Sequence, residues 1–339
     1  MEINISKDGS EGSKIVIGET KILLKKLLEG RDAIFITDTN VYPLYKDIIG
    51  NNRYITIGIG EENKTLDSVT KIFEELLTIG ADRSSFLVGM GGGIVTDITG
   101  FVASTYMRGC DFGFIATTLL SQVDASVGGK NGVNFERYKN MVGTFNQPKF
   151  VICDINMLST LPEREIKCGM AEIVKMGLIG DSSLFHKMED KGYDGIMGDK
   201  EFLKEIIYRA IEMKAEIVSR DEREHGDRKK LNLGHTTAHA IEKSSTSFQH
   251  GEAVAIGLSK AASISEKLGK ITTQQRIEIE NTIKKLGLPI DSYIDKETLF
   301  QALKSDKKKE LDTINFIVMN GIGDCEIVKL KFDDLYTIF

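Results

Sequence analysis

The first half of the chain alternates short apolar runs with amphipathic stretches, and this alternation restricts the possible folds more than any other feature. Residues 66–77 have apolar side chains at helical spacing, and a second helix is expected to begin near Ile94. Four apolar runs have the length and composition of buried strands: 33–37, 54–57, 85–88 and 112–115. Strands that alternate with helices predict a mostly parallel sheet with helices packed on it.

The character of the chain changes near residue 155. Pro162 is followed by the acidic residues Glu163 and Glu165, a pattern typical of a helix N-terminus. Four later segments have a helical period: 201–220, 231–243, 251–267 and 272–286. The sequence therefore predicts an N-terminal α/β domain of residues 1–155 and a mostly α-helical C-terminal domain of residues 156–339.

Composition excludes several classes of partner. The net charge of −6 gives no reason to expect binding to nucleic acid, and no run of eighteen apolar residues suggests a membrane span. Residues 1–14 are polar and lack the apolar core of a signal peptide. The 4 cysteines are scattered, without a CxxC pair, and are read as reduced thiols. We expect a cytoplasmic protein.

Three consecutive glycines, Gly91, Gly92 and Gly93, fall between a predicted strand and a predicted helix. Bare backbone there lets phosphate oxygens approach the N–H groups of a helix N-terminus. The alternative is a tight turn that needs positive φ, and the motif alone leaves both open because it does not match GxGxxG. Asp38 and Asn40, at the end of an earlier strand, are candidates for ribose hydroxyls.

Histidines and a glutamate suggest a metal site. The chain has 5 histidines, and His235 and His239 are spaced to share one helix face, which we expect to include Asn232. His250 begins the next helical segment, and Glu172 lies in an otherwise apolar helix where a carboxylate is costly to bury unless it is paired or bound to metal. Two imidazoles and one carboxylate are typical of catalytic Zn²⁺ sites. The alternative is a hydrogen-bonded or solvated histidine pair.

Several lysines are found in unusual surroundings. Lys130 follows Gly128 and Gly129, and Lys175, three residues after Glu172, is expected to face the same way. Lysines beside glycines or on an apolar face suit the capture of phosphate, carboxylate or enolate. For any single lysine, a solvated side chain is the alternative.

At this point the motifs resemble those of the 3-dehydroquinate synthases, in family order from Asp38 to about Lys308. The most specific block covers residues 117–134, which include TTLLSQVDASVGGK. The others are residues 91–97, 106–109, 139–143, 161–165, 171–175, 232–235 and 250–254. The resemblance implies a Rossmann-like α/β domain that binds NAD and an α-helical domain that binds metal and substrate.

The resemblance also implies roles for individual residues. Glu172, His235 and His250 would bind zinc or cobalt. Catalytic roles would fall to Lys130, Lys175, Lys214, Asn232 and His239. Substrate would be bound by Arg108, Asp124, Asn140, Arg228, Lys307 and Lys308, with Arg108 reaching the phosphate in the neighbouring subunit of a homodimer. NAD would be contacted by Asp38, Asn40, Glu61, Lys64, Gly92, Gly93, Asp97, Thr117, Thr118, Lys130, Lys139 and Thr160.

By resemblance, the substrate is 3-deoxy-D-arabino-heptulosonate 7-phosphate, a sugar phosphate of the shikimate pathway. NAD would take a hydride transiently, phosphate would leave by β-elimination, and re-reduction and an aldol closure would give 3-dehydroquinate. The chain departs from the usual motifs at Thr96 and Ala238, where glycine is common, and in a shorter stretch from His239 to His250. These departures question the loop geometry and leave the ligands intact.

Three alternatives compete with this interpretation. A sister sugar-phosphate cyclase, of the amino-dehydroquinate or 2-deoxy-scyllo-inosose type, would share both cofactors and differ around the substrate carboxylate. A metal-dependent polyol dehydrogenase would use NAD as a true co-substrate. A catalytically inactive nucleotide-binding regulator would have no need of Glu172, His235 and His250.

Overall fold

The structure is a computed structural model that describes residues 1–5, 12–136, 138–306 and 313–339. The chain divides into two units: unit 1 contains Met1–Leu161 and Lys214–Ser219, and unit 2 contains Pro162–Met213 and Arg220–Phe339. The division at Leu161 compares with a sequence-based boundary near residue 155. Within the described ranges, every helix is too short or too polar to traverse a lipid bilayer.

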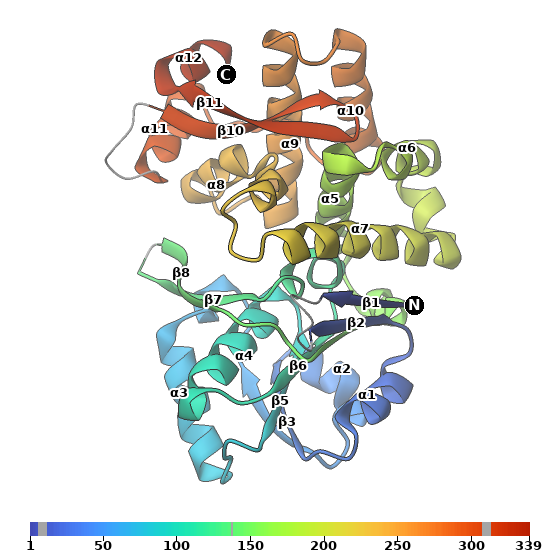
Figure 1. The fold of residues 1–339 in the computed structure, drawn as a ribbon, viewed down its shortest axis with the longest axis vertical. Coiled ribbons are helices and arrows are strands. Elements are labelled where there is room, and N and C mark those ends of the chain that lie inside the picture. Colours follow the sequence, from blue (N-terminus) through green and yellow to red (C-terminus); the bar gives the residue numbers. More distant parts are fainter. Residues whose placement is uncertain (6–11, 137, 307–312) are drawn as a thin grey trace. The chain divides into compact units, whose positions relative to one another are not determined.

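Unit 1 is built on a seven-stranded sheet with the order β1-β2-β9-β6-β5-β3-β4 (Figure 1). Every neighbouring pair is parallel except β1 and β2, which are antiparallel. The sheet strands are β1 (Glu2–Ile5), β2 (Ser13–Ile17), β3 (Ala33–Asp38), β4 (Arg53–Ile57), β5 (Phe86–Gly91), β6 (Phe112–Ala116) and β9 (Phe150–Cys153). This confirms the predicted α/β class.

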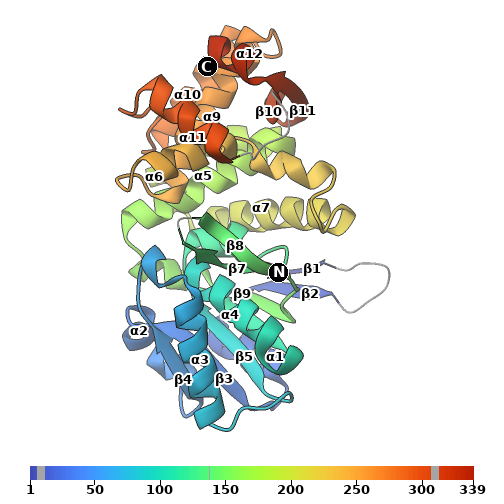
Figure 2. The ribbon, with the colours of Figure 1, turned by 90° about the vertical axis from the view of Figure 1, so that its left-hand side faces the viewer.

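Helices cover both faces of this sheet, as Figure 2 shows. They are α1 (Thr20–Leu28), α2 (Val41–Ile49), α3 (Leu66–Thr78) and α4 (Gly93–Thr105). On one face, Leu24 and Leu28 of α1 and Ile49 of α2 pack against Phe35 and Phe86. Burial on both faces explains why the central strands are continuous apolar runs, since no residue of β5 or β6 faces solvent.

Unit 1 also contains a two-stranded antiparallel hairpin, β7 (Lys130–Phe135) and β8 (Tyr138–Phe145). It contacts α4, where Gly100 lies so close to Asn131 that an added Cβ would come within 1.9 Å of the Asn131 Oδ1 atom. The hairpin follows directly after Gly128 and Gly129, both at positive φ. It carries Lys130, Lys139 and Asn140 of the predicted site.

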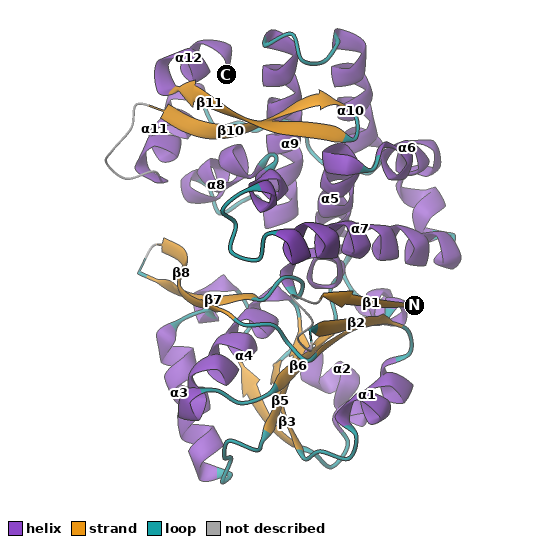
Figure 3. Ribbon diagram, viewed as in Figure 1, coloured by secondary structure: helices purple, strands orange, loops and turns teal. Residues whose placement is uncertain are grey.

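Unit 2 is mostly helical, as predicted, with one antiparallel hairpin (Figure 3). The central helix α9 packs against α5, α8, α10 and β10. The helices are α5 (Glu163–Gly180), α6 (Ser182–Met197), α7 (Lys200–Arg220, of which Lys214–Ser219 group with unit 1), α8 (His235–Ser244), α9 (His250–Lys267), α10 (Thr273–Lys285), α11 (Lys296–Asp306) and α12 (Phe332–Ile338). The hairpin consists of β10 (Thr313–Gly321) and β11 (Asp324–Lys331).

One predicted boundary is wrong. The helix expected from Leu231 begins at His235, and Asn232 belongs to a separate 3₁₀ helix, Asp227–Asn232. Gly234 separates the two with a φ of 79°, which a continuous α-helix does not allow. The 4 cysteines, all within the described ranges, are buried and free of disulfides, as the sequence predicts.

Candidate metal and nucleotide sites

The candidate nucleotide site lies at the carboxyl ends of β3 and β5. The chain leaves β3 for β4 on one side and returns to β5 on the other, which makes the ends of these strands a topological switch point. Asp38 ends β3, and its Oδ1 atom accepts hydrogen bonds from the backbone N–H groups of Asn40 and Val41, each at 2.8 Å. The carboxylate therefore shapes the turn that we assigned to ribose recognition.

The glycine loop joins β5 to α4 at this edge of the sheet. Gly92 has φ −77°, and none of Gly91, Gly92 and Gly93 has positive φ, so the tight-turn explanation is wrong. An added Cβ would lie 2.5 Å from Val95 at Gly91 and 3.1 Å from Thr118 at Gly92. The glycines thus allow close packing. Because the N-cap residue Gly92 has no side chain to accept from them, the first N–H groups of α4 are available to phosphate.

Lys64 connects predicted nucleotide and substrate residues within unit 1. Its Nζ atom lies 2.5 Å from Oδ2 of Asp97 and 2.6 Å from Oδ1 of Asn140, although only 5% of Lys64 is exposed. Burial raises the pKa of the Asp97 carboxyl, and the nearby Lys64 ammonium only partly opposes this effect. Asn140 has φ 52°, and its backbone N–H donates to the Asn134 side chain at 2.8 Å.

The remaining candidates of unit 1 lie around the same strand ends and the hairpin, except Arg108, which lies between α4 and β6 at the amino-terminal edge of the sheet. The backbone N–H of Thr117 donates to Gly91 O at 3.0 Å, the Thr118 hydroxyl pairs with that of Ser121 at 3.0 Å, and Thr160 pairs with the Tyr45 hydroxyl at 2.6 Å. Lys214 donates to both the backbone and the carboxylate of Asp124 at 2.7 Å. Glu61 accepts from Asn134 at 2.8 Å. Exposed positions are held by Arg108, Lys130 and Lys139.

The candidate metal site is formed by three helices of unit 2. Glu172 comes from α5, His235 is the first residue of α8, and His250 is the first residue of α9. One ligand-type atom from each of these residues lies within 4.8 Å of the others. The structure therefore brings together the three residues that the sequence proposed as metal ligands.

Both imidazoles face the same carboxylate oxygen. Nε2 of His250 lies 3.3 Å and Nε2 of His235 lies 3.5 Å from Oε1 of Glu172, whose side chain is completely buried. The other oxygen, Oε2, lies 2.5 Å from Nζ of Lys175, so the two residues face the same way as their spacing predicts. One oxygen of the buried carboxylate therefore faces an ammonium group, and the other faces two imidazoles.

The electrostatics of the cluster follow from burial and from these contacts. Burial by itself would raise the pKa of Glu172, but Lys175 and the two histidines outweigh it and hold the pKa well below the ordinary value. Burial and the Lys175 charge lower the pKa of His235 to about 3. Burial opposes the charge of His250 as well, but its contacts with the carboxylates of Glu172 and Glu242 raise its pKa to about 10.

Each imidazole uses its second nitrogen for another partner. Nδ1 of His235 lies 3.3 Å from the carbonyl oxygen of Leu233, and Nδ1 of His250 lies 3.3 Å from Oε1 of Glu242. Such partners fix the ring orientation and the tautomer of metal-binding histidines. The sequence analysis missed Glu242, although it lies seven residues after His235 and on the same face of α8.

Glycines beside the two histidines bring the helices into close contact. A Cβ added at Gly257 of α9 would lie 2.1 Å from the carbonyl oxygen of Gly234, which precedes His235. One added at Gly251, which follows His250, would lie 2.2 Å from Cα of Cys168 on α5. Only glycine permits this approach, so the backbone itself holds both imidazoles near Glu172.

The donor set fits a divalent transition metal. Within the described residues, neither oxygen of Glu172 has a hydrogen bond of normal geometry, and the carboxylate is instead surrounded by an ammonium group and two imidazoles. Two nitrogen ligands and one oxygen ligand leave a coordination position open, as catalytic Zn²⁺ sites require. Co²⁺ accepts the same ligands.

The other predicted site residues of unit 2 are Arg228, Asn232, His239, Lys307 and Lys308. Arg228 is 2% exposed, its backbone N–H donates to Asp221 at 3.1 Å, and its guanidinium donates to Glu222 O. Asn232 donates to Glu224. His239 is exposed, and its ring centroid lies 5.6 Å from that of His235. Lys307 and Lys308 lie outside the described residues.

The matching family models and the most similar curated relatives agree on one family. Residues 54–168 match the family model described as 3-dehydroquinate synthase N-terminal, and residues 169–309 match 3-dehydroquinate synthase C-terminal. The 3-dehydroquinate synthase of Thermoanaerobacter pseudethanolicus is 41% identical over 93% of this chain and 92% of that relative.

Two solved structures of similar fold contain cofactors. A 2-deoxy-scyllo-inosose synthase complexed with carbaglucose-6-phosphate, NAD⁺ and Co²⁺ has a TM-score of 0.89 and 25% identity, covering 100% of this chain and 99% of that one. The 2-epi-5-epi-valiolone synthase ValA of Streptomyces hygroscopicus subsp. jinggangensis, with NAD⁺ and Zn²⁺ bound, has a TM-score of 0.88 and 25% identity, covering 99% and 96%.

Proposed function

The chain belongs to the 3-dehydroquinate synthase family, and from this membership we propose that it converts 3-deoxy-D-arabino-heptulosonate 7-phosphate into 3-dehydroquinate and phosphate. The reaction is a carbon–oxygen lyase step within the shikimate pathway to aromatic amino acids and chorismate. The proposed location is the cytoplasm.

The observation that carries this proposal is the buried Glu172 carboxylate with two imidazole Nε2 atoms within 3.5 Å. Glu172, His235 and His250 would hold Zn²⁺ or Co²⁺, which when bound supplies a Lewis acid for the substrate oxygens. The residues at the carboxyl ends of β3 and β5 would hold NAD, which when bound supplies a reversible hydride acceptor, so that the reaction involves no net oxidation.

Lysine side chains of the chain would stabilise the negative charge that develops during the reaction. The reaction develops charge on a carbon next to a carbonyl group and releases an anion. Lys175 and Lys214 are buried, where an ammonium group interacts more strongly than in water. We assign charge stabilisation to Lys130, Lys175 and Lys214, and the phosphate surroundings to Arg108, Lys130, Asn140 and His239.

The other assigned residues orient the substrate and the nucleotide. Substrate hydroxyl and carboxylate groups need fixed hydrogen-bonding partners, for which we propose Asp124, Arg228, Asn232 and one of Lys307 and Lys308. The nucleotide would be held by the residues around the glycine loop, with Lys64 and Asp97 as its charged partners. Arg108 would act in the neighbouring subunit of a homodimer.

We assign His239 a part in proton movement, because its imidazole is exposed on the face of α8 that carries His235 and an imidazole can both donate and accept a proton. The leaving phosphate can itself act as a base, so His239 would assist it. His239→Ala should lower kcat and change the pH profile while metal content stays the same. An unchanged kcat and pH profile would remove this role.

A single assay tests the proposed reaction. Purified protein is incubated with the heptulosonate phosphate, Zn²⁺ and NAD far below the substrate concentration. We expect one phosphate released for each substrate consumed, without net NADH. Accumulation of NADH would instead indicate a dehydrogenase. Turnover of glucose 6-phosphate or an amino-substituted heptulosonate in place of this substrate would indicate a sister cyclase.

A further inference from the structure

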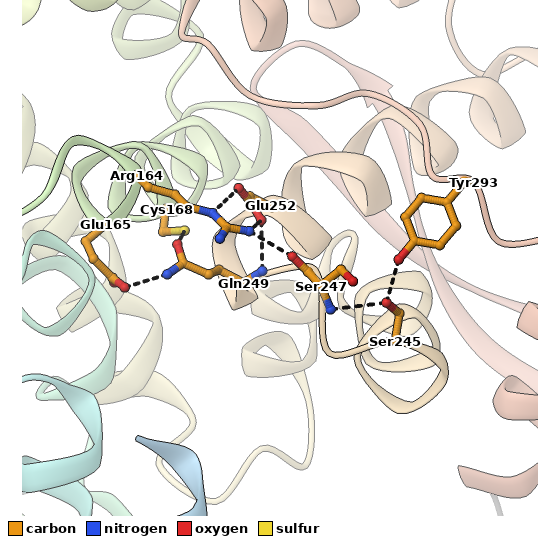
Figure 4. Close-up of polar contacts among 8 residues, drawn as sticks. All are labelled: Arg164, Glu165, Cys168, Ser245, Ser247, Gln249, Glu252 and Tyr293. Carbon is orange, nitrogen blue, oxygen red and sulfur yellow. Dashed lines mark hydrogen bonds and ion pairs between the residues drawn. The ribbon is translucent and has the colours of Figure 1, made fainter. Parts of the chain in front are cut away.

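A cluster of polar side chains connects the N-terminus of α9 to the first turns of α5 (Figure 4). We refer to it as the α5–α9 polar cluster. Its members are Arg164, Glu165 and Cys168 on α5 and Ser247, Gln249 and Glu252 at the start of α9. None of these six residues is among the ligands or substrate contacts proposed above.

Arg164 makes the strongest contacts in this cluster. Its guanidinium group donates to both carboxylate oxygens of Glu252, from Nε at 2.7 Å and from Nη2 at 2.6 Å. Nη2 also donates to the carbonyl oxygen of Ser247 at 2.8 Å. Two parallel hydrogen bonds from one planar group fix orientation as well as distance.

Gln249 is held at both ends of its amide group. Its Nε2 atom donates to Glu165 at 2.6 Å, and its Oε1 atom accepts from Sγ of Cys168 at 3.2 Å. Its backbone N–H donates to Glu252 Oε2 at 2.8 Å, which links it to the Arg164 pair. Residues on either side of His250 are therefore fixed to α5.

The cluster lies directly beside the candidate ligands. His250 is enclosed between Gln249 and Gly251, and Gly251 rests against the backbone of Cys168. Cys168 and Glu172 are one helical turn apart on α5, so they share a face. The same helix face that holds the start of α9 thus also presents Glu172 to His250, at 3.3 Å.

We propose that Arg164 is a positioning residue for the metal site, which fixes His250 relative to Glu172 through its paired hydrogen bonds to Glu252 and Ser247. This inference rests on the proposed metal-binding function of Glu172, His235 and His250. A contribution to stability alone does not explain this paired geometry well. The Arg164 side chain is 54% exposed, and exposed ion pairs contribute little to stability.

The chain offers a matched control for Arg164. Arg209 makes the same type of paired contact with Asp181, from Nε at 2.9 Å and from Nη2 at 2.6 Å, also within unit 2. This pair links α7 to the residue that precedes α6 and does not involve residues 247–252. Arg209→Gln therefore removes a paired contact of the same geometry, from a less exposed arginine that also lies 3.6 Å from Glu205, without touching the segment that carries His250.

The experiment compares Arg164→Gln, Arg164→Lys and Arg209→Gln with the unmodified full-length protein. Zn²⁺ affinity is measured by competition with a chromogenic chelator, the ligand field by the visible spectrum of the Co²⁺-loaded protein, and stability by urea unfolding in EDTA. We expect Arg164→Gln to weaken Zn²⁺ binding about 10- to 100-fold and to change the Co²⁺ spectrum. Arg164→Lys should recover only part of the affinity, because lysine lacks the paired donors.

Arg209→Gln should leave Zn²⁺ affinity and the Co²⁺ spectrum unchanged. Equal losses of affinity in Arg164→Gln and Arg209→Gln would reduce the cluster to a general contribution to stability, and an affinity within twofold of the unmodified protein would overturn the positioning role. If Arg164→Gln does not fold, Glu252→Gln provides the same test while keeping an oxygen for Gln249. Failure of the unmodified protein to bind Zn²⁺ would instead sink the proposed metal chemistry itself.

Discussion

Glu172 combines complete burial with an ionised state, and the residues around it explain how. Lys175 balances its charge on one oxygen, while the imidazoles of His235 and His250 face the other. A neutral amide of the same shape would keep the packing and lose the charge that a metal ion requires. Replacing the Glu172 carboxylate by an amide therefore tests the metal proposal directly.

Glu172→Gln should abolish stoichiometric Zn²⁺ binding and, with it, turnover. The measurement is metal content after dialysis, together with phosphate release. The control is Glu278→Gln, because Glu278 belongs to another histidine–carboxylate group, His186, Glu189 and Glu278, in which the histidine is exposed and the carboxylates are half-buried. Zn²⁺ retained at full stoichiometry in Glu172→Gln would exclude this carboxylate as a ligand.

Metal binding should depend on pH through His250. In the metal-free protein Glu172 and Glu242 raise the pKa of His250 to about 10, whereas that of His235 is lowered to about 3. At pH 8 His250 therefore carries a proton that a metal ion must displace, and His235 carries none. Zn²⁺ affinity should rise by about tenfold per pH unit below pH 10, with about one proton released.

Calorimetric titrations at pH 8, in buffers of different ionisation enthalpy, give this proton count.

The same pKa shift has an opposite consequence for the stability of the metal-free protein. Because the folded-state pKa of His250 lies above its unfolded value of 6.5, its contribution to stability is complete below pH 6.5 and is lost as the pH rises through 10. Metal uptake without proton release would show that His250 is not the displaced group.

Glu242→Gln should weaken Zn²⁺ binding about 10-fold or more, because it removes the carboxylate 3.3 Å from Nδ1 of His250. The pKa of His250 should fall with it, and the proton release at pH 8 should decrease. Chelator competition and proton release are the two measurements. An unchanged affinity would mean that the close packing of Gly251 against the backbone of α5 orients the ring without Glu242.

Close backbone contacts between helices determine where His235 and His250 lie relative to Glu172. Gly257→Ala should destabilise the protein by about 1–3 kcal/mol and weaken Zn²⁺ binding, because its Cβ would lie 2.1 Å from Gly234 O and push His235 aside. Urea unfolding and chelator competition measure the two effects. Gly195→Ala in α6 is the control and should be neutral or stabilising by up to about 1 kcal/mol.

The sequence predicts elements well where local pattern and tertiary environment agree. The strands β3, β5 and β6 were found because they are apolar runs buried on both faces, and the edge strand β4 was found although its exposed and buried residues alternate. The strands β1 and β2 were missed because they are short and partly polar, and β2 gains its place by pairing with β9 more than 130 residues away. The hairpin of β10 and β11 was likewise missed, because its exposed positions interrupt the apolar pattern.

The candidate site shows the same division. Glu172, His235 and His250 were proposed because their residue types are typical of metal ligands and unusual in apolar helices. Arg164 and Gln249 were missed because they are ordinary polar residues, whose meaning depends on a partner up to 88 residues away. The start of α8 was misplaced because a glycine at positive φ cannot be recognised from the helical period alone.

At the scale of the whole molecule, each cofactor has its own unit as proposed binding site. NAD should slow amide hydrogen exchange in unit 1, around Asp38 and residues 91–97, whereas Zn²⁺ should slow it in unit 2, around Glu172 and His235. Binding to the native state alone predicts this local protection, and hydrogen exchange read by mass spectrometry measures it. Zn²⁺-dependent protection that survives in Glu172→Gln would contradict the assignment.

The helix α7 has a consequence for how such a chain can be cut or recombined. Its residues up to Met213 group with unit 2, whereas Lys214–Ser219 group with unit 1, where Lys214 bonds to Asp124. A fragment that ended at Leu161 would contain the complete sheet of unit 1 but would lack residues Lys214–Ser219 of α7. A gene fusion or an exchange between relatives that uses a single breakpoint would therefore not transfer unit 1 intact. We expect the two halves of the chain to be inherited together.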